Sequence, residues 1–121
     1  MSKTINEYSL VEVMEKIEQI VNENSAPIDG YNASYQFDIS GEEEGTYQLH
    51  FLDGKATVKN IAESPADCTL GLSLNNFHLF LLGKLNGTVA FMTGKLKIKG
   101  DIGKAIKLEG ILRKYNVKDH L

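Results

Sequence analysis

A regular alternation of apolar and polar side chains over residues 33–61 is the feature that most limits how this chain folds. Residues 33–40 place apolar side chains at every odd position, and residues 47–51 repeat the pattern. Such a period of two is typical of a strand with one buried face. Asp53-Gly54 then has the composition of a two-residue hairpin turn, whose central positions both need positive φ. We expect half-buried strands at 33–40, 47–51 and 55–61, with a solvated acidic loop at 41–45.

Two further alternating segments follow. Cys68, Leu70 and Leu72 alternate with polar or small residues after Pro65, which predicts a fourth strand. We expect these four successive strands to form an antiparallel meander. Leu96 and Ile98 alternate with lysines at positions 95, 97 and 99 and predict a fifth strand with a cationic outer face.

Helical spacing appears at both ends of the chain. Residues 10–21 are apolar on one face, Ser9 and Glu12 have the spacing of a capping box, and Pro27 follows the expected end. Three further helices are expected at 77–82, capped by Asn75 or Asn76 and closed by Gly83, at 88–92, closed by Gly94, and at about 102–115.

The later helices are more apolar than one packing contact requires. Residues 77–82 are apolar around almost the whole helical circumference, and residues 102–115 have a broad apolar arc. This pattern suits either a dense helix layer or the lining of an apolar cavity, and the residues alone leave both open.

Length and composition favour one ordinary globular domain spanning residues 1–121. The chain is 42% apolar and 24% charged, with 2 prolines. Its lone cysteine, Cys68, cannot form an intramolecular disulfide, which favours a reducing, cytoplasmic setting. Residues 1–9 lack the pattern of a signal peptide, no segment has the length and apolarity of a membrane span, and residues 118–121 depart from known address signals.

Charge is divided unevenly along the chain. Residues 1–60 carry 4 lysines against 11 acidic residues, for a net −7, whereas residues 61–121 carry 9 basic against 5 acidic residues, for +4. A basic second half is compatible with transient contact with an anionic membrane surface or with nucleic acid, and equally with a solvated face.

The sequence does not match the common phosphate-binding, RNA-binding, metal-binding or catalytic motifs. Residues 100–104 superficially resemble a phosphate-binding loop, but Ile98 and Ala105 stand where that motif needs Gly and Ser or Thr, and a Gly-x-x-Gly after a strand does not fit the RNA-binding module either. We therefore expect no nucleic-acid partner. Three scattered histidines and one cysteine imply no metal, and no catalytic constellation or cofactor motif is present.

The second half of the chain resembles the sterol carrier protein type-2 family. The resemblance rests on about 40 continuous residues that include Cys68-Thr69-Leu70, Phe77 through Asn86, Ala90-Phe91-Met92, Gly94 through Ile98, Gly100-Asp101 and Ala105 through Leu108. The preceding helix and hairpin follow the family's order. One departure is Gly87, where many members have proline, which loosens a helix start.

The resemblance implies an α+β fold, with a five-stranded mixed, mostly antiparallel sheet covered on one face by helices. An apolar tunnel between them would take a fatty acid, acyl-CoA, phospholipid or sterol, for binding or transfer rather than catalysis. The alternative is a non-catalytic accessory or interaction module with a protein partner, such as a lipid- or quinone-handling enzyme. The implied tunnel residues are Phe77, Phe80, Leu81, Leu85, Val89, Met92, Ile106 and Leu108.

Overall fold

A five-stranded sheet in the order β3-β2-β1-β4-β5 forms the centre of the computed structural model, which describes residues 4–62 and 64–121. Three neighbouring pairs of strands are antiparallel, and β1 and β4 are parallel. The predicted five-stranded mixed sheet is therefore confirmed, although residues 1–3 of the polar amino-terminal segment lie outside the described residues. The strands are β1 (Ala33–Ser40), β2 (Gly45–Leu52), β3 (Lys55–Lys59), β4 (Cys68–Ser73) and β5 (Lys97–Gly100).

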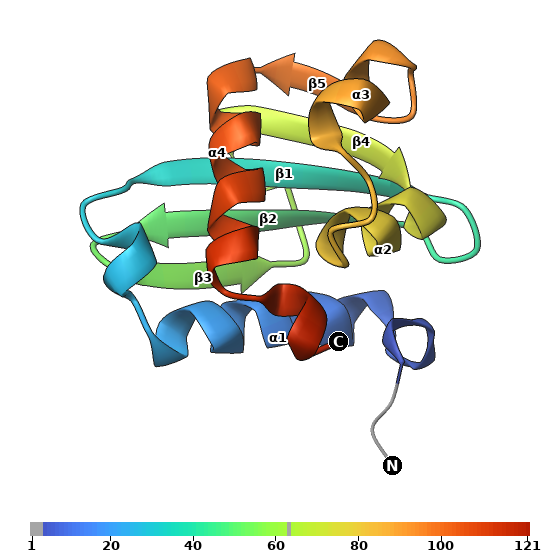
Figure 1. The fold of residues 1–121 in the computed structure, drawn as a ribbon. Helices are drawn as coiled ribbons and strands as arrows, with labels where there is room; N and C mark the ends of the chain where they lie inside the picture. The colour runs from blue at the N-terminus through green and yellow to red at the C-terminus, as the bar shows by residue number, and fades with distance from the viewer. Residues whose placement is uncertain (1–3, 63) are drawn as a thin grey trace.

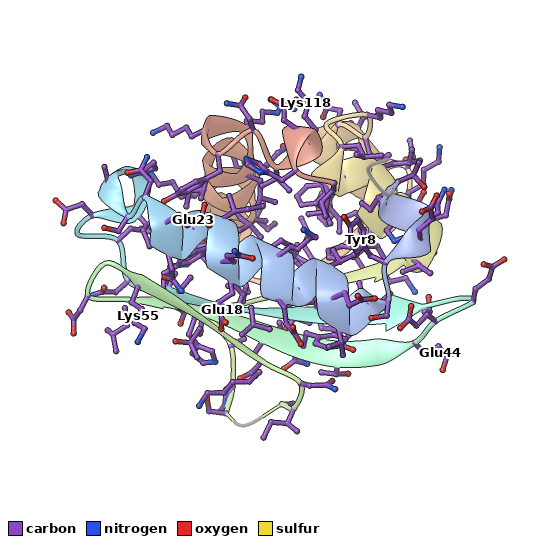
Figure 2. The ribbon with its side chains drawn as sticks, turned by 90° about the horizontal axis from the view of Figure 1, so that it is seen from below. Tyr8, Glu18, Glu23, Glu44, Lys55 and Lys118 are labelled. Atoms are coloured by element: carbon purple, nitrogen blue, oxygen red, sulfur yellow. The ribbon has the colours of Figure 1, made fainter. Side chains whose placement is uncertain are left out.

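The connection from β3 to β4 crosses the face of the sheet opposite the helices (Figure 2). There the Gln48 side chain donates a hydrogen bond to the Ser64 carbonyl at 2.7 Å, and the Asp67 N–H donates to the Ser34 carbonyl at 3.1 Å. The crossing delivers β4 to the far side of β1, where Tyr35 lies opposite Cys68 in parallel register.

The predicted four-stranded antiparallel meander is consequently wrong at its fourth strand. Alternation shows which side chains of a strand face the core, but it does not show which neighbour the strand pairs with. The antiparallel order β1-β2-β3 is correct, and the two-residue turn at Asp53 and Gly54 has positive φ at both positions, 52° and 76°.

Four helices lie on one side of the sheet (Figures 1 and 2). They are α1 (Leu10–Glu23), α2 (Leu74–Leu81), α3 (Gly87–Met92) and α4 (Ile102–Lys114), accompanied by the 3₁₀ turns η1 (Ile5–Glu7), η2 (Ala26–Ile28) and η3 (Val117–Asp119). Both halves of the predicted capping box are present: the Ser9 hydroxyl accepts from the Glu12 N–H at 3.1 Å, and the Glu12 carboxylate accepts from the Ser9 N–H at 2.9 Å. None of the described helices has the length and apolarity to cross a membrane.

Helix α2 begins earlier than predicted, because β4 runs into it without a loop. Its N-cap is Ser73, whose hydroxyl accepts a hydrogen bond from the Asn76 N–H at 3.2 Å, so the expected caps Asn75 and Asn76 are wrong. Serine and asparagine are equally good caps, and residue type alone does not choose between them. By contrast, α4 begins as expected after Asp101, which accepts from the Lys104 N–H at 3.2 Å.

The core fills the space between the sheet and the helices. Tyr35 is fully buried within it, and its hydroxyl donates to the Lys104 carbonyl at 2.7 Å and contacts the Tyr31 hydroxyl at 2.6 Å. Burial, and then the hydrogen bond with Tyr31, raises the pKa of the Tyr35 phenol. These contacts join β1 to the first turn of α4 and thereby fix the position of the beginning of α4, close to α3 and β5.

Candidate functional site

An apolar cavity of about 70 Å³ lies between α3, the first part of α4 and the strands β4 and β5. Figure 1 shows α3 and α4 together over this end of the sheet. Thr88 and Glu109 are the polar side chains on its wall, and the remaining side chains are hydrocarbon or aromatic. The apolar wall comprises Leu70, Phe80, Phe91, Leu96, Ile98, Ile102, Ala105 and Ile106.

The strands β4 and β5 place two neighbouring apolar side chains on the floor of this cavity. Leu70 on β4 lies directly opposite Ile98 on β5 in antiparallel register. Because neighbouring side chains of a strand alternate between faces, Ile98 points towards the helices while Lys97 and Lys99 point away. The floor of the cavity is therefore apolar although β5 is rich in lysine.

Three apolar cavity residues are also exposed to solvent. Phe91 is 39% exposed, Ile102 46% and Ile106 59%. They lie on α3 and on the first two turns of α4, and we call them the mouth of the cavity. Exposed apolar side chains beside a cavity are one of the features that mark a ligand-binding groove.

A second hollow, of about 300 Å³, lies between the end of α2, the end of α4 and η3. It is more polar than the cavity, because Arg113, Asn116 and Lys118 contribute to its wall. Phe80 and Glu109 line both spaces and so form the partition between them. An amphipathic molecule that displaced this partition would find hydrocarbon on one side and cationic side chains on the other.

Glu109 is held in place from two directions. Its carboxylate accepts a hydrogen bond from the Gly87 N–H at 3.0 Å and forms an ion pair with Arg113 at 3.3 Å. The Glu109 side chain is 17% exposed, whereas that of Arg113 is 62% exposed. A Cβ atom on Gly87 would lie 3.0 Å from the same carboxylate, so glycine at this position permits the close approach of α3 to α4.

The eight side chains that the resemblance implied fall into five groups. Phe80 and Ile106 lie on the cavity wall, and Leu81 lines the second hollow together with Phe80. Phe77 and Leu108 are fully buried in the core. Leu85 packs partly buried against the core, and Val89 and Met92 are 55% and 79% exposed.

Sequence reasoning did not select most of the wall. The apolar residues it missed are Leu70, Phe91, Leu96, Ile98, Ile102 and Ala105, and it also missed Gly87, Thr88 and Glu109. One signal was available for Ile98, because its alternation with lysines already assigned it to the inner face of the sheet.

The described part of the chain has no metal cluster, and its cysteine is poorly suited to nucleophilic chemistry. Cys68 is buried at the start of β4, and burial, followed by the negative charge of Asp101, raises the pKa of its thiol to about 11. A thiol with a raised pKa is a poor nucleophile at neutral pH. Among residues 4–62 and 64–121, no three His, Cys, Asp or Glu side chains gather closely enough to hold a metal ion.

The family comparison covers the residues that form this site. The model of the SCP-2 sterol transfer family matches residues 14–113, which include the whole sheet and the cavity. The chain belongs to this family. Membership places this SCP-2 domain among lipid-binding and lipid-transfer domains in general, and the family's fold is the one observed here.

Individual relatives are similar over nearly the whole chain. Hydroxysteroid dehydrogenase-like protein 2 of Xenopus tropicalis is 40% identical over 118 residues, which are 97% of this chain but 28% of that protein. Sterol carrier protein 2 of Yarrowia lipolytica, solved in an apo form, is 31% identical with a TM-score of 0.70, covering 96% of this chain and 98% of its own. The sterol carrier protein domain 2 of Helicoverpa armigera is 27% identical with a TM-score of 0.74, covering 96% and 94%.

This SCP-2 domain thus spans about a quarter of the length of the curated Xenopus relatives it matches. Those longer proteins carry a dehydrogenase-like name. The similarity concerns the SCP-2 portion, and the activity of the rest of such a protein does not transfer with it.

Proposed function

We propose that this SCP-2 domain is a non-catalytic lipid carrier whose ligand places its hydrocarbon in the cavity between α3, α4 and the β4–β5 edge. The observation that supports this most directly is the wall, which is hydrocarbon or aromatic apart from Thr88 and Glu109. Binding in such a cavity is driven by the removal of alkyl or ring surface from water and depends little on the chemistry of the headgroup. Fatty acids, acyl-CoA, phospholipids and sterols are therefore the candidate ligands.

Binding requires the cavity to enlarge. Its volume of about 70 Å³ is well below the roughly 300–1,000 Å³ of pockets that enclose a ligand. Helix α3 has 6 residues, and the bond from Gly87 to Glu109 joins its first residue to α4. We infer that α3 moves away from α4 and that Phe80 rotates, which joins the cavity to the second hollow in the predicted tunnel. This movement also gives new neighbours to the side chains of Val89 and Met92, which belong to α3, and of Leu85, which precedes it.

The energy available from hydrocarbon burial is sufficient for useful affinity. Each methylene removed from water contributes about 0.8 kcal/mol, so a long acyl chain contributes roughly 12 kcal/mol before the costs of association. Micromolar binding needs about 8 kcal/mol. The difference of about 4 kcal/mol is available to offset the opening of α3 and the desolvation of the headgroup.

Native mass spectrometry of gently purified protein, with solvent extraction of any released lipid, tests the carrier function. A stoichiometric adduct with the mass of a lipid supports it and identifies the ligand class. Protein that is bare and also fails to bind fluorescent fatty acids and sterols refutes it.

Ile106→Glu provides a site-specific version of this test. Ile106 lines the cavity but is 59% exposed, so a carboxylate there reaches water and does not unfold the domain. Leu52, on the β2–β3 hairpin, is also 59% exposed, and Leu52→Glu is a matched control. We expect Ile106→Glu to weaken fatty-acid binding at least about tenfold and Leu52→Glu to leave it unchanged. Leu81→Glu is a poorer probe because Leu81 is 4% exposed and the change destabilises the fold.

A second candidate function is that of an accessory module for a lipid- or quinone-handling enzyme. The observation in its favour is that the domain forms about a quarter of longer, dehydrogenase-like relatives. Co-purification of a stoichiometric protein partner with a lipid-free domain would favour this function over the carrier. We also propose that the protein resides in the cytoplasm, because its single cysteine, Cys68, has no partner for an intramolecular disulfide.

A further inference from the structure

We propose that the domain docks on anionic lipid bilayers through α3 and the beginning of α4, with the mouth of the cavity facing the membrane. The docking itself is independent of ligand binding, whereas its use for loading lipid rests on the carrier function proposed above.

Five large apolar side chains of these two helices are exposed. They are Val89, Phe91, Met92, Ile102 and Ile106, with exposed fractions between 39% and 79%, and we call them the α3–α4 patch. Figure 1 shows α3 on the helix side of the sheet, beside the start of α4 and next to β5. Single exposed apolar residues are ordinary on a protein surface, but three of these five, Phe91, Ile102 and Ile106, line one cavity, and grouped exposed apolar side chains mark an interaction site.

The segments around the patch are cationic. Residues 84–107 contain 6 lysines and a single acidic residue, Asp101. Lys104 is paired with Asp67 at 3.0 Å, whereas Lys84 precedes α3, Lys95 follows it and Lys107 adjoins Ile106. Apolar side chains among exposed lysines are the usual composition of a surface that inserts into the headgroup region of an anionic bilayer.

The opposite edge of the domain has the reverse charge. Helix α1, which lies beside β3 in Figure 1, carries 4 glutamates against the single Lys16. An anionic surface therefore repels α1 and attracts the end of the domain that holds α3 and β5. The charge distribution orients the docking as well as strengthening it.

A bilayer fits this surface better than a protein partner does. Met92, at the end of α3, is 79% exposed and protrudes, so it offers insertion into a soft apolar phase. In addition, three members of the patch, Phe91, Ile102 and Ile106, are the mouth of the cavity. A lipid that enters there from a docked membrane passes from one hydrocarbon environment to another without crossing water.

Vesicle co-sedimentation at low and high salt tests the proposal. One set of vesicles contains phosphatidylcholine alone and is neutral. The other contains about 30% phosphatidylglycerol and has an anionic surface. We expect binding to the anionic vesicles only, reduced by salt. Lys84→Glu with Lys95→Glu should weaken it at least about tenfold, since each lysine near such a surface contributes roughly a fivefold factor, whereas Lys55→Glu on β3 should have little effect.

The apolar contribution has its own matched pair. Val89 and Ile61 are 55% and 57% exposed, and Ile61 lies outside the patch, after β3. We expect Val89→Asn with Met92→Asn to reduce vesicle binding several-fold and Ile61→Asn to leave it unchanged. All variants tolerate the change because the side chains are already in water.

Three outcomes would overturn the proposal. Equal binding to neutral and anionic vesicles would show that the lysines do not contribute to docking. An equal loss of vesicle binding in the patch variants and in their controls would show that docking does not use this face. Failure to bind vesicles, accompanied by self-association in sedimentation velocity runs that the patch variants abolish, would assign the patch to a second copy of the chain. Fatty-acid binding in vesicle-free solution, measured in parallel, reports on the carrier function separately.

Discussion

The backbone N–H of Gly87 and the carboxylate of Glu109 form a hydrogen bond of 3.0 Å that joins the first residue of α3 to α4. Glu109→Ala leaves this partly buried N–H without its acceptor, and we expect it to destabilise the domain by about 1–3 kcal/mol. Urea denaturation measures the change. Glu44→Ala in the exposed β1–β2 loop is the control and should stay within about 0.5 kcal/mol of the parent.

Gly87→Pro should be destabilising in the parent protein although proline is favoured in the first turn of a helix. The ring removes the N–H that Glu109 accepts from, and it adds a Cβ atom 3.0 Å from the carboxylate. In the Glu109→Ala background both costs disappear, so the same change should be neutral or stabilising. A double-mutant cycle with a coupling energy below about 0.5 kcal/mol would contradict this interpretation.

Ala105→Leu should fill the cavity. Ala105 is buried at its wall, and the added methyl groups occupy space that the ligand needs. We expect the free energy of unfolding to change by less than about 1.5 kcal/mol and fatty-acid affinity to fall at least about tenfold. Ala62→Leu, at an exposed alanine, makes the same change in size away from the cavity. Normal binding by Ala105→Leu would place the ligand elsewhere.

Arg113→Gln should distinguish a charged headgroup from the hydrocarbon. Arg113 lines the second hollow beside Glu109 and is largely exposed, so we expect the variant to weaken fatty-acid binding only about 2–5-fold. Binding of a fatty alcohol of the same length should be unaffected, because the alcohol carries no charge. Titrations of both ligands against Arg113→Gln, with Lys55→Gln as control, measure the difference.

His78 should make the domain less stable in mildly acidic solution. It is 8% exposed, its Nδ1 lies 3.0 Å from the Asn6 side chain, and its Nε2 is buried with no hydrogen-bond partner among the described residues. Burial lowers the pKa of His78, an effect that nearby Glu43 partly offsets. The unfolded chain therefore binds the proton more readily. Stability should be complete above about pH 6.5 and decline as the pH falls from there towards the lower pKa of the folded state.

Urea denaturation at pH 7.5 and pH 5.5 measures this loss for the parent and for His78→Gln. The glutamine variant cannot take up the proton, so its loss between the two pH values should be smaller. An identical loss in both proteins would assign the acid sensitivity to other groups.

Much of the fold could be predicted because its signals are local. The alternation around Tyr35 and Phe37, the Asp53-Gly54 turn and the Ser9–Glu12 capping box each depend on residues within a few positions of one another. The parallel pairing of Tyr35 with Cys68 depends on the β3–β4 connection, which hydrogen bonds from Gln48 and to Ser34 hold against the sheet. No local sequence pattern in that connection predicts its path.

The candidate site was less predictable for a similar reason. Residues 77–82 are apolar all around, so periodicity does not separate Phe77, which is in the core, from Phe80, which lines the cavity. The distinction depends on tertiary neighbours, because the Phe77 ring packs against Phe37 of β1 whereas Phe80 lines the cavity below α3 and α4. The resemblance assigns Val89 and Met92 to the tunnel; both are exposed in the structure, and their contact with a ligand stays a prediction.

The parallel pairing of β1 with β4 also constrains how the chain is made. Strands β1, β2 and β3 are consecutive and can pair as soon as they leave the ribosome, but β1 then presents a complete row of unpaired N–H and C=O groups until residues 68–73 arrive. During that interval the nascent chain displays an open edge at what becomes the middle of the sheet. Closing the crossover is the long-range step of folding, and it sets the period during which the growing chain is most exposed to aggregation.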